Sequence, residues 1–291
     1  MQTENNIIVD FDKNSKQLLG SKSVVGRNYA TTDLPIVKEQ TFVKAGDLLS
    51  KNHLPDKNKG LYCLIGQAEN GEVYFCDITK APHILVGGCT GSGKSIFLRG
   101  VVLSLIMNYT PDEVGLVLLD TKQHCEFVVY DDVPHVLGKE LALAEEELER
   151  RLSAAGGNGT GKNIVVVIDE YAELSRNPQT RLVVEKLLRF GHGVGIYVIM
   201  ATQRLAKEVI TPTLQACLAT VVCCRVGEKS TSKFALGKYG AEKLLGKGDM
   251  LYKDGGGNIT RVQSGYVFNH DVQEIVEKIK GKYERRALDK K

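Results

Sequence analysis

Short runs of apolar residues alternate with segments of helical periodicity through most of this chain. Each run is followed by polar residues, and the runs occupy residues 84–86, 114–119, 164–168, 196–200 and 221–226. Continuous apolar runs are typical of strands in a parallel sheet, because such strands are buried on both faces. The pattern therefore predicts an α/β fold, with a mainly parallel sheet covered by helices on both faces.

Two of the intervening helices can be located from their apolar faces and caps. Residues 141–152 place glutamates on one face of a helix and, on the opposite face, Leu141, Ala144, Leu148 and Leu152. A second helix is predicted to begin at Pro178, with Asn177 as its N-cap, because proline favours the first helical position and asparagine the cap.

Short β-hairpins are predicted at both ends of the alternating region. Runs 61–66 and 72–77 flank Asn70-Gly71, which is a strong signal for a hairpin turn. Runs 250–252 and 259–262 surround a run of three glycines in the same way. The predicted organisation is an N-terminal arm or small add-on over residues 1–60, a main domain over 61–268, and a basic C-terminal helix over 269–291 with Asp271 as its cap.

Composition and cysteine usage are those of an ordinary soluble protein. Of the 291 residues, 43% are hydrophobic and 25% are charged. The seven cysteines form no C-x-x-C pair, which favours reduced thiols in a reducing compartment. No signal peptide is recognisable, and no apolar stretch approaches the ~20 residues needed to span a bilayer. We therefore expect a cytoplasmic protein with no transmembrane segment of its own.

Positive charge is concentrated near the C-terminus. Residues 278–291 contain seven basic and two acidic residues and carry +5, so the remainder carries −2 of the net charge of +3. Binding of a polyanion by the body of the protein would therefore depend on local placement of basic residues.

A glycine-rich loop follows the first apolar run and precedes an apolar helix. Its sequence is G-x-x-x-x-G-K-S, formed by Gly88, Cys89, Thr90, Gly91, Ser92, Gly93, Lys94 and Ser95. Glycines let successive backbone N–H groups surround phosphates at the positive end of a helix. This motif predicts ATP binding, with Lys94 reaching the β- and γ-phosphates and the Ser95 hydroxyl holding Mg²⁺.

A pair of carboxylates follows the buried run 164–168. Asp169 is expected to hold Mg²⁺ and Glu170 to orient and deprotonate the attacking water. Acidic residues can end a strand for structural reasons alone, but that alternative is weak in a chain that also contains a phosphate loop. Both acids stand where open α/β sheets bind their ligands, at the carboxyl ends of strands.

Several further polar residues are candidates for catalysis. Gln203 follows the run 196–200 and could contact the γ-phosphate or the lytic water. Arg150, Arg151 and Arg189 are candidate arginine fingers, which supply positive charge during phosphoryl transfer. From the pattern alone, a solvated helix face is the stronger interpretation of Arg150 and Arg151, because four glutamates precede them.

Several of these segments together resemble the motor domain of FtsK/SpoIIIE DNA translocases, in the wider FtsK–HerA class of P-loop ATPases. The resemblance extends from about Gly60 to Phe268, and its segments are residues 82–86, 120–122, 134–137, 147–151, 166–174, 195–204 and 244–252. The last segment, Leu-Leu-Gly-Lys-Gly-Asp-Met-Leu-Tyr, is distinctive because a generic phosphate-loop fold does not explain it.

The resemblance implies a RecA-like ATPase motor over residues 61–268 that assembles as a homo-oligomeric ring, usually a hexamer. ATP and Mg²⁺ would lie between subunits, and double-stranded DNA would pass through the central pore. It also makes Arg150 and Arg151 the leading candidates for a finger acting across the interface. This chain resembles the short forms of the motor that occur on plasmids, integrative elements and phages. A membrane or relaxosome-type protein is therefore a candidate partner.

Contacts to DNA are the least defined part of this prediction. Lys122 and Lys162, the latter at the end of the glycine-rich loop 156–162, are candidates for the pore. The basic tail, 278–291, offers a competing explanation, either as an external DNA-binding helix or as a solvated surface.

Two residues depart from the family pattern, and two other functions remain alternatives. His192 stands where relatives commonly have arginine, and Leu205 where they have proline. A neutral histidine cannot reproduce a guanidinium charge. The alternative functions are a protein-translocating ATPase like those of type VII secretion, and a non-translocating ATP-binding regulator of a DNA-processing complex.

Overall fold

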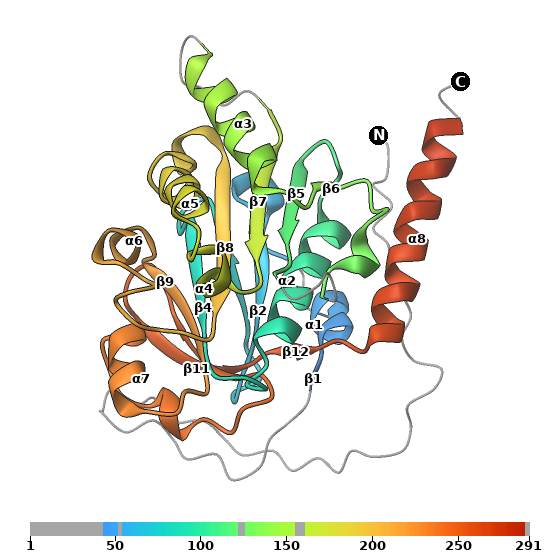
Figure 1. Cartoon of the computed structure of the whole chain (residues 1–291). Helices are drawn as coiled ribbons and strands as arrows, with labels where there is room; N and C mark the ends of the chain where they lie inside the picture. The colour runs from blue at the N-terminus through green and yellow to red at the C-terminus, as the bar shows by residue number, and fades with distance from the viewer. Residues whose placement is uncertain (1–42, 52–53, 122–125, 155–160, 289–291) are drawn as a thin grey trace.

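The central sheet of the molecule has ten strands. In the computed structural model, which describes residues 43–51, 54–121, 126–154 and 161–288, the strand order is β3-β2-β11-β10-β9-β4-β8-β7-β5-β6 (Figure 1). The strands are β2 (Tyr62–Ala68), β3 (Val73–Asp77), β4 (His83–Gly87), β5 (Val114–Leu119), β6 (Val136–Gly138), β7 (Asn163–Ile168), β8 (Ile196–Thr202), β9 (Thr220–Cys224), β10 (Asp249–Lys253) and β11 (Ile259–Gln263). A separate pair joins β1 (Val43–Lys44) to β12 (Gly265–Tyr266).

One half of the sheet is parallel and the other is antiparallel. Strands β9, β4, β8, β7, β5 and β6 pair in parallel and contain the apolar runs seen in the sequence. The hairpins β2–β3 and β10–β11 add the antiparallel half. The predicted α/β fold, a largely parallel sheet with hairpins at both ends, is confirmed.

Helices cover both faces of the sheet (Figure 1). One core cluster lies under α1 (Ala45–Lys51), α2 (Lys94–Asn108) and α8 (Asn269–Leu288). The opposite cluster lies under α3 (Leu141–Ser153), α4 (Tyr171–Leu174), α5 (Pro178–Phe190), α6 (Pro212–Cys217) and α7 (Lys229–Leu236). Successive side chains of β4 alternate between them, because Ile84 and Val86 belong to the first cluster and Leu85 to the second.

The predicted cap of α5 is present, whereas the apolar face of α3 differs at its end. The Asn177 side chain accepts a hydrogen bond from the backbone N–H of Gln179, and Pro178 is the first helical residue. On α3, Leu141, Ala144 and Leu148 are buried as predicted. The next buried position is Arg151 rather than Leu152, which is 49% exposed.

Both ends of the described chain pack onto the main domain. Ala45 and Leu48 of α1 belong to the same core cluster as α2, so packing crosses the boundary predicted after residue 60. Helix α8 begins at Asn269, so Asp271 lies in its first turn and is not its cap. One face of α8 enters that cluster through Val272, Ile275, Val276 and Ile279.

Candidate nucleotide-binding site

The phosphate loop lies at the carboxyl edge of the sheet, between β4 and α2. Strands β4, β7, β8 and β9 are parallel neighbours, so their carboxyl ends meet at this edge. Gly93 has a left-handed backbone, with φ 111°, and an added Cβ would stand 2.3 Å from the nitrogen of Gly248. The loop therefore needs glycine at this position for both conformation and space.

Lys94 points back onto its own loop. Its Nζ donates to the carbonyl oxygens of Gly88 at 2.8 Å and of Cys89 at 2.9 Å, and the residue is 5% exposed. A buried ammonium must be bonded, and these carbonyls hold it where the loop curls. Phosphate oxygens bound in the loop would offer the same ammonium a stronger, charge-assisted partner.

The two predicted magnesium ligands are neighbours. The Ser95 hydroxyl donates to Oδ1 of Asp169 at 3.3 Å, and Asp169 is fully buried at the end of β7. A hydroxyl and a carboxylate are hard oxygen donors, the class that Mg²⁺ prefers together with phosphate oxygens and water. These residues therefore fit a magnesium ion bound beside the phosphates.

Glu170 is held in place by the end of the neighbouring strand β8. Its Oε1 accepts hydrogen bonds from Thr202 Oγ1 at 2.9 Å and from the backbone N–H of Gln203 at 3.0 Å. The residue is 4% exposed. Two donors therefore hold the carboxylate directly after Asp169, an orientation that suits a general base.

Gln203 connects β8 to the phosphate loop. Its Oε1 accepts a hydrogen bond from the Thr90 hydroxyl at 2.6 Å. Both residues line a cavity of about 360 Å³, whose walls are Thr90, Gly91, Gly93, Lys94, Ser95, Ile96, Glu126, Gln203, Lys247 and Tyr266. This volume falls in the range of small-molecule sites. The fold thus brings most of the loop, Lys94, Ser95 and Gln203 to one cavity, with Asp169 bonded to Ser95.

Glu126, Lys247 and Tyr266 line this cavity without having been predicted from the sequence. They come from three separate segments far from the loop, so spacing alone gives no signal for them. Lys247 belongs to the distinctive segment 244–252, to which the sequence assigned a family resemblance but no role.

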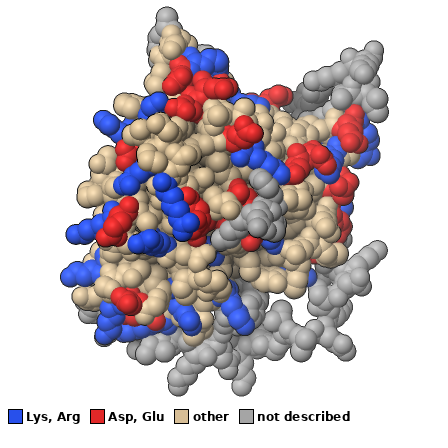
Figure 2. Space-filling view, in the orientation of Figure 1, with Lys and Arg blue, Asp and Glu red and all other residues tan. Residues whose placement is uncertain are grey.

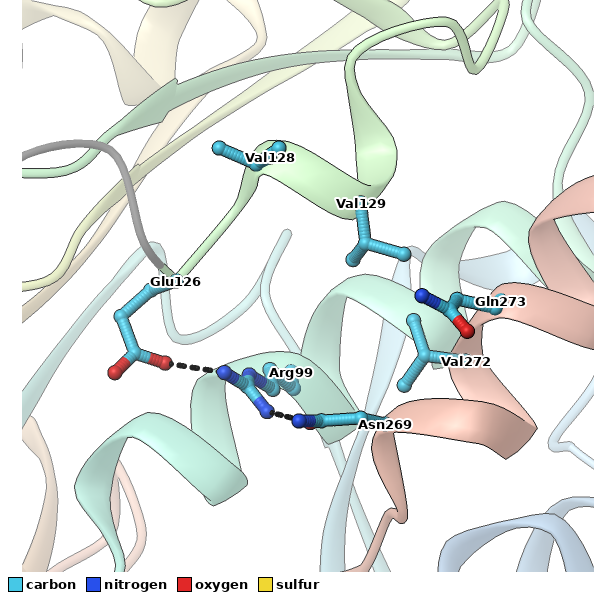
Figure 3. Close-up of a pocket in the computed structure, with 7 residues that line it drawn as sticks. All are labelled: Arg99, Glu126, Val128, Val129, Asn269, Val272 and Gln273. Atoms are coloured by element: carbon cyan, nitrogen blue, oxygen red, sulfur yellow. Dashed lines mark hydrogen bonds and ion pairs between the residues drawn. The ribbon is translucent and has the colours of Figure 1, made fainter.

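A second cavity of about 250 Å³ lies between α2 and the start of α8 (Figure 3). Arg99 of α2 points toward both Glu126 and Asn269, with Nη2 2.9 Å from Glu126 Oε2 and Nη1 2.5 Å from Asn269 Oδ1. Glu126 also lines the first cavity, and its backbone N–H donates to Asp120 Oδ2 at 2.7 Å. One carboxylate thus forms part of the wall of both cavities.

Comparison with known proteins relates this chain to a family of DNA translocases. Residues 48–155 match the model of the FtsK/SpoIIIE family. The chain is 33% identical to "DNA translocase FtsK" of Mesorhizobium japonicum, over 88% of this chain and 35% of that protein. Residues 48–155 belong to the FtsK/SpoIIIE family. The resemblance expected from the sequence is confirmed, and the chain spans about a third of the length of this curated relative.

Solved structures of related ATPases share the fold. The conjugation coupling protein TcpA of pCW3, determined with ATPγS, superposes with a TM-score of 0.66 and 25% identity, covering 85% of this chain and 74% of that one. The cytoplasmic domain of the type VII secretion ATPase EccC of Thermomonospora curvata gives a TM-score of 0.69 at 23% identity, over 78% of this chain and 32% of that one. The second likeness concerns the fold alone.

The two arginines that the family resemblance favoured have different surroundings. Arg151 is 5% exposed, and its guanidinium donates to the carbonyl oxygens of Val194 at 2.7 Å and of Lys162 at 2.8 Å. Arg150 is exposed and pairs with Glu147. Hydrogen bonds from Arg150, and to a smaller extent from Arg151, lower the pKa of Glu147 to about 2. Arg189, the third candidate, is exposed, with its guanidinium 5.2 Å from the centre of the Phe190 ring.

Arg151 lies at the opposite edge of the sheet from the phosphate loop. Its carbonyl partners directly precede β7 and β8, whereas Asp169 and Glu170 follow β7. A six-residue strand spans ~20 Å, so neither Arg151 nor its neighbour Arg150 can reach the phosphates of its own chain.

Lys162, His192 and Leu205 are not among the residues that line the cavity. Lys162 is partly buried at the amino end of β7, and its Nζ donates to the Pro111 carbonyl at 3.2 Å. Lys122 lies outside the described residues, as do residues 156–160 of the glycine-rich loop that ends at Lys162. His192 approaches the Thr79 carbonyl at 3.1 Å, and Leu205 packs against Gly87.

Within the described residues, no helix is both long and apolar enough to cross a membrane.

Proposed function

We propose that this chain is an ATPase motor that translocates double-stranded DNA as a homo-oligomeric ring. The observation that carries the ATPase part is the fixed position of Glu170. Thr202 and Gln203 bind its carboxylate, while Asp169, the preceding residue, lies 3.3 Å from Ser95 of the phosphate loop. A base, a metal-ligand pair and a phosphate loop at one edge of a sheet are the elements of phosphoryl transfer to water.

Each residue has a distinct task in this proposal. Lys94 exchanges its loop carbonyls for the β- and γ-phosphates of ATP. Ser95 and Asp169 hold Mg²⁺, which supplies positive charge to the phosphates. Glu170 orients the attacking water and takes its proton. Gln203, through its bond to Thr90, links the end of β8 to the loop and responds to loss of the γ-phosphate.

The ring is proposed because no arginine is among the described residues that line the cavity. Among the residues that line the described cavity, the basic ones are lysines. Arg150 is exposed on α3, away from its own phosphate loop, and can therefore serve a neighbouring subunit. Arg151 is better assigned to holding α3 against the sheet. A hexamer follows from the family resemblance.

DNA is proposed as the substrate because the chain is about one-third identical to proteins named DNA translocases. The TcpA likeness supports a role in conjugative transfer, with segregation or packaging of a mobile element as related tasks. A relaxosome-type or membrane protein is the proposed partner that would recruit such a motor to its DNA. A cytoplasmic location is proposed because the described cysteines are free thiols. The EccC likeness does not favour protein as the substrate, because it concerns the fold alone.

A basic surface on α7 joins Lys122, Lys162 and the basic tail as a candidate DNA contact. Figure 2 shows lysine and arginine side chains gathered toward the lower left, where α7 lies in Figure 1. Lys229 and Lys233 of α7 are exposed, as is Lys238 just after the helix, and Lys233 Nζ lies 5.6 Å from the centre of the exposed Tyr239 ring. Lys278 and Lys280, by contrast, pair with acids of α8 and with Asp132.

The test is the rate of ATP hydrolysis with and without linear duplex DNA. We expect strong stimulation, and basal turnover alone would instead favour a regulator of a DNA-processing complex. Three variants then locate the DNA contact: Lys122 and Lys162 replaced by Ala, Lys229, Lys233 and Lys238 replaced by Ala, and the seven basic residues of 278–291 replaced by Ala, which leaves the buried Ile279 in place. The variant that loses stimulation at saturating DNA identifies the sensing surface. A variant that loses only affinity, with a salt slope reduced by about 1 per phosphate contact, identifies accessory binding.

A further inference from the structure

The turn that precedes β10 has an unusual backbone. Gly246, Lys247 and Gly248 all have positive φ, at 87°, 50° and 91°. Within the described residues, Lys247 is the one non-glycine residue with positive φ. A side chain with a Cβ raises the energy of this conformation by about 1 kcal/mol relative to glycine. A lysine between two glycines therefore stands where a third glycine would be more stable.

This turn is attached directly to the phosphate loop. The Gly248 N–H donates to the Ser92 carbonyl at 2.9 Å, and Gly93 approaches Gly248 too closely to carry a side chain. On its other side, the Gly248 carbonyl accepts from the Ser264 N–H at 2.7 Å and the Lys247 carbonyl from the Gln263 side chain at 3.1 Å. The turn is thus hydrogen-bonded to the phosphate loop on one side and to residues 263–264 on the other.

An ion pair between two nearly buried side chains holds the turn in place. Asp249 Oδ2 lies 2.7 Å from Arg261 Nη2, and the same oxygen accepts from the Leu245 N–H at 2.8 Å. Both side chains of the pair are nearly buried, so the hairpin β10–β11 holds the backbone of the turn in place. The position of the Lys247 Cα relative to the loop is therefore defined by the fold.

Lys247 lines the nucleotide cavity together with residues of the phosphate loop. Its neighbours in the cavity wall include Thr90, Gly91, Lys94 and Gln203. A triphosphate brings several negative charges into this space, and lysine is a common point-charge partner of phosphate. We propose that Lys247 is a second lysine that binds the polyphosphate of the nucleotide, from the same subunit as Lys94. This inference rests on the proposed ATPase site.

The competing explanation is that Lys247 has only a structural place in the turn. The two explanations predict the same gain in stability but different nucleotide affinities for Lys247→Gly. A structural lysine with positive φ is replaced by a residue that prefers this conformation, so stability rises and nucleotide affinity stays the same. A phosphate-binding lysine loses its ammonium, so stability still rises but affinity falls. Lys247→Asn tests the same point with a neutral side chain that tolerates positive φ.

The experiment measures the Kd of ATP and of AMP by competition with a fluorescent ATP analogue, alongside thermal unfolding of each variant. For Lys247→Gly and Lys247→Asn we expect the Kd of ATP to rise about tenfold, the effect of one charge-assisted hydrogen bond. The Kd of AMP should change less than about twofold, because AMP lacks the β- and γ-phosphates. Lys247→Arg should restore most of the ATP affinity.

Lys243→Asn is the matched control, because Lys243 is exposed four residues earlier and does not line the cavity. Unchanged ATP affinity in both neutral Lys247 variants would overturn the assignment, as would an equal loss in Lys243→Asn. If the unaltered chain bound no ATP, the proposed ATPase site itself would fail. ATP binding by the unaltered chain together with silent Lys247 variants would overturn only the role of Lys247.

Discussion

The two edges of the central sheet place ionisable residues in different surroundings. At the carboxyl edge, Glu170 and Asp169 are buried but bonded to side chains and loop groups around a cavity. At the amino edge, Arg151 and His83 are also buried, and most of their hydrogen bonds are to backbone groups: Arg151 donates to the carbonyls of Val194 and Lys162 besides Glu147, and the Val198 N–H donates to His83 Nδ1. Lys162 is bound there by a backbone carbonyl as well.

This difference shows that burial of a charge does not by itself identify a reactive site. A charge whose partners are backbone groups of neighbouring elements fixes how those elements pack. A charge whose partners line a cavity can exchange them for a ligand. Arg151 is of the first kind, and Lys94, which also bonds to backbone carbonyls, is of the second because those carbonyls belong to the ligand loop itself.

Among variants that still bind ATP, the largest effect should come from the exposed arginine at the amino edge. Arg150→Ala should reduce DNA-stimulated ATP hydrolysis about 1000-fold, because a finger of this kind contributes at least that much to phosphoryl transfer. Its folding should be unaffected, since the side chain is exposed. Steady-state hydrolysis and thermal unfolding of the assembled protein measure the two effects.

Mixing variants tests whether Arg150 acts across an interface. Rings assembled from Arg150→Ala and Glu170→Gln subunits contain some sites with an intact base facing an intact arginine, so activity should partly return. Failure to recover at any ratio, with mixed assembly demonstrated, would assign Arg150 to the surface and direct attention to Arg189.

At the carboxyl edge, Glu170→Gln should slow hydrolysis about 100-fold while ATP still binds, because the amide keeps the shape but cannot accept the proton. Glu173→Gln is the control, since Glu173 is an exposed acid of the same segment and pairs with Arg176. Lys94→Ala, in contrast, should abolish ATP binding. Normal turnover in Glu170→Gln, measured by phosphate release, would remove Glu170 from the mechanism.

Arg151 offers the corresponding test at the amino edge, with stability as the readout. Arg151→Ala leaves the Val194 and Lys162 carbonyls without their partner and Glu147 without one of its own. We expect the free energy of unfolding to fall by about 3 kcal/mol, as when one partner of a buried charged network is removed. Chemical denaturation of Arg150→Ala and Arg151→Ala under the same conditions makes the comparison. Equal stability of the two variants would contradict the packing role.

The sequence predicted the strands, hairpins and α5 cap well because each depends on local pattern. Apolar runs fix buried strands, and Asn177-Pro178 fixes a helix start through its own bonds. It also predicted a phosphate loop and a carboxylate pair, because phosphate and metal binding require fixed residue types at strand ends, and the fold brings these residues to one edge of the sheet.

Long-range packing limited what the sequence could give. Nothing local distinguishes Arg151 from Leu152 as the buried residue of α3, because both lie one turn after Leu148. The choice depends on carbonyls provided by segments before β7 and β8. Lys247 reaches the cavity for a similar reason, since β10 pairs with β9 and the turn that precedes β10 is hydrogen-bonded to the phosphate loop.

The smallest effect concerns His83 and the pH dependence of stability. Burial, ahead of the nearby His192, lowers the pKa of His83 from 6.5 to about 4, and the Val198 N–H donates to its Nδ1 at 3.1 Å. The ring is therefore neutral when folded, whereas the unfolded chain binds a proton below pH 6.5. Between pH 6.5 and 4 the unfolded state binds more protons than the folded state. The free energy of unfolding is therefore unaffected by His83 above pH 6.5 and decreases as the pH is lowered from 6.5 to 4.

Between pH 7.5 and pH 5, His83 should therefore remove about 2 kcal/mol from the free energy of unfolding. His83→Asn keeps an acceptor near the Val198 N–H but cannot titrate, so its stability should change by that much less over the same interval. His270→Asn is the control, because the His270 side chain is 81% exposed. Urea denaturation of the three proteins at both pH values measures the difference. A slope in His83→Asn equal to that of the unaltered chain would mean that His83 is not the group that titrates, and that the amino edge owes its pH dependence to other residues.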